Sequence, residues 1–146
     1  MELYNYDFSE FEDNDVNEFG LFGYEYIDHY WTENGRYPFI IKVNENIAGF
    51  ALIREVGIKE ERGHTIAEFF ILKKYRRKSI GKKAAFYIFN MFPGKWKIAQ
   101  IEENIPAQNF WLKIIKEYTN GEFHEIREED WHGPKQVFIS KGSLHL

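Results

Sequence analysis

The stretch FFILKKYRRKSIGKK, from Phe69 to Lys83, decides the interpretation of this chain. Its apolar beginning is typical of a strand, and its end begins an apolar pattern with helical spacing. Seven of the eleven residues from Lys73 to Lys83 are lysine or arginine. The first amides of a helix lack partners within the helix and carry partial positive charge. We therefore expect this basic turn to bind a phosphate or pyrophosphate group.

The other elements follow from alternation, helical spacing and turn residues. Residues 55–63 are mostly charged and predict an exposed connection. Asn104 is a predicted helix cap, and Pro106 suits a first helical turn. The predicted strands are 1–8, 37–43, 47–53, 65–72, 96–101, 122–127 and 136–140, and the predicted helices are 22–33, 80–92 and 104–118. This order predicts one mixed sheet covered by helices, with a right-handed parallel crossover after the basic turn.

Composition limits the classes of protein that fit. The chain has 146 residues, which favours one domain spanning 1–146, and 44% hydrophobic residues argue against intrinsic disorder. The absence of cysteine excludes disulfides and thiolate catalysis. The five histidines lack metal-ligand spacing, so no metal is expected. No targeting or membrane-spanning segment is evident, which makes a soluble cytoplasmic protein the expectation.

Two segments carry a family resemblance. The segment from Arg76 to Gly81 resembles the Gln/Arg-x-x-Gly-x-Gly/Ala acyl-CoA loop of the GNAT superfamily of N-acetyltransferases, with Ser79 at the first glycine position. The segment from Asn104 to Trp111 resembles the Asn-x-x-Ala-x-x-Phe-Tyr motif of the same family. The resemblance spans most of the chain. It implies an α/β fold of the α+β type, with a single mixed, largely antiparallel central sheet flanked by helices.

The resemblance also implies acetyl-CoA as co-substrate and an N-acetyltransferase activity on a primary amine, by direct transfer in a ternary complex. Strand backbone would pair with the pantetheine arm, amides of the basic turn would hold the pyrophosphate, and two residues of the second motif would touch the arm. The implied cofactor-binding residues are Phe69, Phe70, Ile71, Arg76, Arg77, Lys78, Ser79, Ile80, Gly81, Lys82, Asn104 and Phe110.

The acid and base are less defined. Glu68 lies in an otherwise apolar strand, where burial would raise its pKa toward that of a useful base, although it could equally face solvent. Glu102 and Glu103 are alternatives at the end of the next strand. Trp111 stands where the family often has a tyrosine acid, so Tyr118, a water molecule or departure of CoA as a thiolate remains open. Helical spacing favours Tyr118 as a core residue.

The resemblance also implies that the acceptor side is lined by the N-terminal segment, after the first strand and including the following helix. Residues 1–35 carry ten acidic and no basic residues, and aromatic residues are interspersed. Asp28, Tyr30 and Trp31 are therefore candidate contacts for a small cationic amine. Two other interpretations compete: a non-catalytic acyl-CoA-binding module and, with Tyr75 among the basic residues, a nucleic-acid-binding domain. Neither a nucleic-acid nor a membrane partner is expected, and the sequence leaves a homodimer open.

Overall fold

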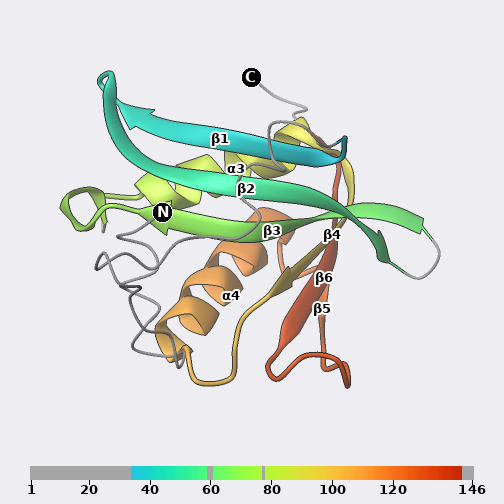
Figure 1. Ribbon diagram of the computed structural model, residues 1–146. Coiled ribbons are helices and arrows are strands. Elements are labelled where there is room, and N and C mark those ends of the chain that lie inside the picture. The colour runs from blue at the N-terminus through green and yellow to red at the C-terminus, as the bar shows by residue number, and fades with distance from the viewer. Residues whose placement is uncertain (1–33, 59–60, 77, 143–146) are drawn as a thin grey trace, which may run out of the picture.

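The computed structural model describes residues 34–58, 61–76 and 78–142. Its strands form one open sheet in the order β1-β2-β3-β4-β6-β5 (Figure 1). All neighbouring strands are antiparallel except β3 and β4. The elements are β1 Arg36–Val43, β2 Asn46–Ile58, β3 Glu61–Ile71, a short 3-10 helix Lys73–Tyr75, α3 Ile80–Met91, β4 Gly94–Ala99, α4 Ile105–Thr119, β5 Phe123–Ile126 and β6 Lys135–Ser140. The predicted mixed, largely antiparallel sheet is confirmed; the predicted strand 1–8 and helix 22–33 lie outside the described residues.

The predicted connection at residues 55–63 is wrong. Strand β2 continues to Ile58 and β3 begins at Glu61, so residues 55–58 and 61–63 belong to two long antiparallel strands. Ile58 is 3% exposed and lies against Gly63, where a Cβ would come within 2.5 Å of the Ile58 Cδ1. The charged residues Glu61 and Arg62 are exposed beside these buried positions. The sequence pattern misleads here because charged residues outnumber the few apolar ones.

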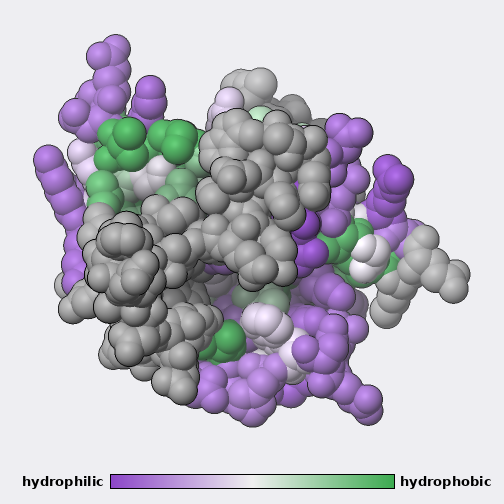
Figure 2. All heavy atoms as spheres, viewed as in Figure 1, coloured by the Kyte–Doolittle hydropathy of each residue, from purple (hydrophilic) through white to green (hydrophobic). Residues whose placement is uncertain are grey.

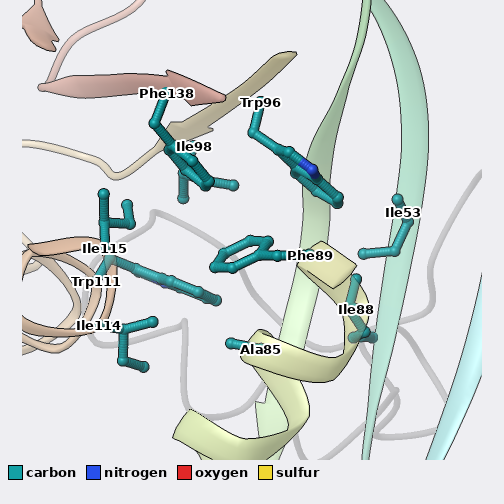
Figure 3. Close-up of a cluster of buried hydrophobic side chains, with 11 residues drawn as sticks. Ile53, Ala85, Ile88, Phe89, Trp96, Ile98, Trp111, Ile114, Ile115 and Phe138 are labelled. Atoms are coloured by element: carbon teal, nitrogen blue, oxygen red, sulfur yellow. The ribbon is translucent and has the colours of Figure 1, made fainter. Parts of the chain in front are cut away.

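A single core cluster holds the two described helices against one face of the sheet. Phe89 of α3 lies at its centre, with Trp96 of β4, Trp111 of α4 and Phe138 of β6 around it (Figure 3). The centroid of the Phe89 ring lies 5.0 Å from those of Trp96 and Phe138. In Figure 1, α3 crosses behind β1 and β2, so the viewer sees the opposite face of the sheet. The core therefore fixes α3 and α4 relative to β4.

Strands β3 and β4 separate soon after they meet. Their ladder contains only the pairs Gly63–Lys95 and His64–Trp96, after which the two strands diverge. The edge of β3 from Thr65 to Ile71 therefore has no ladder partner in β4. A parallel ladder normally satisfies alternate backbone groups along such an edge. The separation opens a space in the middle of the sheet with hydrogen-bonding backbone on one wall.

A bulge interrupts β3 at the same place. Leu52 pairs with Glu68 and Ile53 with Ile66, so Ala67 is the additional residue. Ile66 and Phe69 consequently both pack against the core, although a spacing of three would put them on opposite faces of a regular strand. The bulge reorients the backbone beside Glu68, at the point where β3 leaves β4.

Among the described residues, no helix is long and apolar enough to cross a membrane.

Candidate active site

The separated strands enclose a cavity of about 880 Å³, which we call the splay cavity. One wall is β3 from Ile66 to Ile71, and the opposite wall is the chain from Ile98 to Ile101. The start of α3 and the first turns of α4 complete it, with Ser79, Gly81 and Asn104 in the lining. It therefore joins the edge of β3 that has left the β4 ladder to the N-terminus of a helix, an arrangement that suits a long ligand with an anionic group.

The basic turn that enters the splay cavity is anchored by an apolar residue. Tyr75 is 8% exposed and packs with Ala48 and Ile71 in a second small core cluster. Stacking of this ring on the bases of a single-stranded nucleic acid would require it to be exposed. Its burial removes the aromatic contact on which the nucleic-acid interpretation depended.

Arg76 makes its contacts within the basic turn and the adjoining end of β3. Its Nε donates a hydrogen bond to the Ile71 carbonyl at 2.7 Å, and its guanidinium lies 5.4 Å from the centroid of the Phe70 ring. Its backbone amide donates to the Lys73 carbonyl at 3.2 Å. The Arg76 amide and the Ile71 carbonyl are thus both engaged within the chain. The amides at the start of α3 are the better candidates for a phosphate.

Ser79 occupies a left-handed backbone conformation immediately before α3, with φ 60° and ψ 14°. Its side chain makes no capping hydrogen bond. The Cβ of an L-residue is unfavourable in this region, whereas glycine adopts it without that cost. Ser79 therefore carries the strain that a glycine at this position of the motif would avoid.

Replacing Ser79 with glycine is expected to raise the free energy of unfolding by about 0.5–1 kcal/mol. Thermal unfolding measures this, at roughly 2–4 °C per kcal/mol for a chain of this size. Ser79→Ala is the matched control, since it removes a hydroxyl that caps nothing and keeps the Cβ. A glycine variant no more stable than the alanine variant would contradict the assignment of strain.

Glu68 lies in the wall of the splay cavity beside the bulge. Burial raises the pKa of its carboxyl from 4.5 to about 8. A group with this pKa is partly ionised near neutral pH and can accept a proton from an amine. The residue is half-buried in the structure.

The second motif places two residues against this cavity. Asn104 caps α4, its Oδ1 accepting a hydrogen bond from the Ala107 amide at 3.1 Å, which confirms the predicted cap. The Phe110 ring lies against the start of α3, where a Cβ on Gly81 would be 2.9 Å from the Phe110 Cζ. A glycine at this position therefore lets α4 approach the start of α3 closely.

Two of the three predicted catalytic residues lie outside the cavity lining. Glu102 forms an ion pair with Arg127, whose two terminal nitrogens lie 2.6 and 3.2 Å from its carboxylate oxygens, and this hydrogen bonding lowers the Glu102 pKa. The Tyr118 hydroxyl lies 2.6 Å from Asn90 Oδ1 and 2.7 Å from Ser140 Oγ, and its ring packs on the core. These contacts give both residues structural partners away from Glu68.

The remaining predicted site residues either line the splay cavity, lie beside it or lie outside the described residues. Lys78 and Ile80 lie beside the splay cavity without lining it, and Arg77, Asp28, Tyr30 and Trp31 lie outside the described residues. The structure brings together Glu68, Phe69, Phe70, Ile71, Arg76, Ser79, Gly81, Lys82, Asn104 and Phe110 in one lining.

Sequence reasoning missed Trp131. Its Nε1 donates a hydrogen bond to the Gln100 carbonyl at 2.8 Å, and its ring contributes to the cavity wall. The turn that carries it packs closely on β4, since a Cβ on Gly133 would lie 2.1 Å from that same carbonyl oxygen. A tryptophan two residues before a glycine is a weak signal in sequence. The place of Trp131 in the cavity wall becomes evident only from the structure, in which the turn lies against the end of β4.

A family model covers most of this chain. The model described as the acetyltransferase (GNAT) family matches residues 2–115. The chain belongs to the GNAT acetyltransferase family. No match to a curated protein was found by sequence.

Solved structures of GNAT acetyltransferases share this fold at low sequence identity. An acetyltransferase from Thermus thermophilus aligns with a TM-score of 0.59 at 13% identity, over 77% of this chain and 70% of that one. A GNAT-family acetyltransferase from Staphylococcus aureus gives 0.55 at 21% identity, over 79% and 74%. An acetyltransferase from Bacillus subtilis, solved in complex with CoA, gives 0.54 at 10% identity, over 77% and 81%.

The residues of this GNAT chain fit acetyl-CoA. The edge of β3 that faces away from the β4 ladder after His64 offers backbone groups to an extended amide-containing arm, and the α3 N-terminus offers amides to phosphate. Lys73, Lys82 and Lys113 add positive charge to the lining. Lys82 is held by Glu117, with its Nζ 3.2 Å from the carboxylate oxygen.

Proposed function

We propose that this protein is an N-acetyltransferase that moves the acetyl group of acetyl-CoA directly to a primary amine in a ternary complex. The observation that carries the proposal is the position of Glu68, a buried carboxyl beside the bulge in the cavity that fits acetyl-CoA. Acetyl-CoA would supply the activated acetyl group as a thioester. The chain would supply orientation, exclusion of water and a proton acceptor.

Glu68 is the proton acceptor in this proposal. As the amine nitrogen bonds to the acetyl carbon, the nitrogen loses a proton to the ionised Glu68 carboxylate, and the carbon–sulfur bond breaks. The described residues of the cavity lining include no tyrosine, histidine or cysteine. In this proposal the sulfur leaves as a thiolate and takes its proton from water, so that no acid side chain is needed.

We propose a small acceptor that reaches the site as a cationic amine. This follows from the acidic residues of the N-terminal segment, with Asp28, Tyr30 and Trp31 as candidate contacts outside the described residues. A protonated amine is attracted by such charge and must release a proton before it reacts.

Thermal unfolding with acetyl-CoA tests the first half of this proposal. At a concentration about one hundred times the dissociation constant, acetyl-CoA is expected to stabilise the fold by roughly 2.7 kcal/mol. Lys82→Ala should reduce this shift because Lys82 lines the cavity, whereas Lys83→Ala is the matched control, since Lys83 lies outside the lining. No shift in the wild-type protein would contradict the proposal.

Release of free thiol in the presence of amines tests the second half. Turnover that depends on both acetyl-CoA and amine is expected for an acetyltransferase. Binding of acetyl-CoA without turnover on any amine would instead support the non-catalytic acyl-CoA-binding module.

A further inference from the structure

A second cavity, of about 670 Å³, lies on the sheet face away from α3 and α4. We call it the basic cavity because Arg36, Arg54, Lys97 and Lys135 line it. Arg54 follows the core residue Ile53, and Lys97 lies between two core residues, so both side chains project from the face opposite the core. Figure 2, which views this face, shows hydrophilic side chains gathered over β5 and β6.

The two cavities meet at the bulge. Ile66, Ala67, Glu68, Ala99 and Trp131 line both of them. The Glu68 carboxyl can therefore be approached from either face of the sheet, through the space where β3 and β4 separate. A molecule in the basic cavity can present a group to Glu68 while the splay cavity is filled from the other face.

The cations of the basic cavity are held in place by a small set of carboxylates. The Nζ atoms of Lys97 and Lys135 lie 2.9 and 3.0 Å from the same Glu128 oxygen, and Lys135 also reaches Asp130 at 3.4 Å. The Lys135 side chain is only 9% exposed. Each ammonium has three donors, so the Lys97 ammonium keeps donors beyond its bond to Glu128. Both lysines are therefore held in place by carboxylates and can still donate hydrogen bonds to a ligand.

Two arginines lie beside this set. Arg36 and Arg54 are directly opposite each other in the ladder between β1 and β2. Arg54 forms no ion pair with any residue that the structure describes. Among the described residues, the lining of the basic cavity carries four basic side chains and the two carboxyls of Asp130 and Glu68, and Glu128 beside it pairs with both lysines.

We propose that the acceptor carries a carboxylate or phosphate group besides its reactive amine, and that Arg54, with Arg36 and Lys97 nearby, binds this oxyanion in the basic cavity. The inference rests on the proposed acetyl transfer and defines the class of its acceptor. Arginine favours carboxylate and phosphate because its donors can bind two oxygens together. Arg54 pairs with Thr65, three residues before Glu68, which puts the two positions on the order of 10 Å apart along β3. This separation suits a molecule the size of an amino acid or a dipeptide.

Pairs of amines that differ only in the oxyanion test the inference. Lysine is compared with 1,5-diaminopentane for the carboxylate, and phosphoethanolamine with ethanolamine for the phosphate. Binding to the protein saturated with CoA and kcat/KM for thiol release are measured for each. The wild-type protein is expected to favour at least one oxyanion-bearing member by roughly 10- to 100-fold. The better pair identifies which oxyanion the site takes.

Arg54→Gln is expected to reduce this preference at least tenfold while the thermal shift with acetyl-CoA persists. Arg62→Gln is the matched control, because Arg62 is an exposed arginine of the same hairpin outside the basic cavity. Equal binding of both members, preference for the amines without an oxyanion, or no binding of any of the four would overturn the inference. If acetyl-CoA causes no thermal shift in the wild-type protein, the proposed function itself is overturned.

Discussion

Replacing Glu68 with glutamine is expected to lower kcat for acetyl transfer by roughly 100-fold. The amide keeps the size of the side chain but cannot accept a proton, and positioned general bases typically contribute about 10²–10⁴-fold. We take the lower end because water can partly replace the carboxylate. Binding of acetyl-CoA should persist, since the backbone edge of β3 and the start of α3 are unchanged. Thiol release under saturating substrates, beside the acetyl-CoA thermal shift, measures both effects.

The pH dependence makes this prediction specific to Glu68. Burial raises its pKa to about 8, and the base is active only when ionised. The wild-type kcat should therefore rise with pH and level off above about 8, and the glutamine variant should lack this rise. Glu102→Gln tests the competing assignment. Because Glu102 is paired with Arg127 and its pKa is lowered, its variant should retain the rise. Loss of the rise in the Glu102 variant alone would contradict our assignment.

The same carboxyl links stability to pH, independently of any substrate. The folded-state pKa of about 8 lies above the ordinary value of 4.5, so the folded protein binds more protons than the unfolded chain between these values. The free energy of unfolding of the wild-type protein should therefore fall relative to that of Glu68→Gln as pH rises from about 5 to 8. Denaturant unfolding at a series of pH values measures this difference. Parallel stability curves for the two proteins would show that Glu68 titrates normally.

Much of the cofactor side of this site could be predicted from the sequence because it depends on local features. A basic turn between a strand and a helix, an asparagine cap and an apolar helix face are all encoded within short segments. Asn104 could be located as a helix cap for that reason, whereas the strained backbone of Ser79 is seen only in the structure. The cofactor roles of these residues stay predictions, but their convergence on one cavity is a property of the fold.

The acceptor side could not be predicted because it depends on contacts between distant segments. The basic cavity joins Arg54 of β2 to Lys97 of β4 and Lys135 of β6, residues that no local pattern relates. The bulge at Ala67 is visible in sequence only as a change of alternation phase, which a continuous apolar run conceals. Charge in the N-terminal segment indicated a cationic acceptor. The described lining indicates an oxyanion as well, and an amino acid-like acceptor satisfies both.

Replacing Phe89 with alanine is expected to lower the free energy of unfolding by about 3–5 kcal/mol. Phe89 is completely buried, and its ring lies 5.0–5.1 Å, centroid to centroid, from those of Trp96, Tyr118 and Phe138. The rigid rings around it, contributed by separate elements, limit collapse into the space. Because native domains are stable by only about 5–15 kcal/mol, this loss is a large share of the total. Thermal unfolding should show a midpoint lower by roughly 10 °C.

Tyr87→Ala is the matched control, because Tyr87 lies on the same helix, is also aromatic and is 70% exposed. It should change the free energy of unfolding by about 0.5 kcal/mol or less. The comparison also bears on function, since Phe89 fixes the helix whose first amides are proposed to bind phosphate. Acetyl-CoA at about one hundred times its dissociation constant would add roughly 2.7 kcal/mol, less than the loss caused by Phe89→Ala. The cofactor should therefore restore only part of the lost stability, and equal stabilities of the two variants would refute a core centred on Phe89.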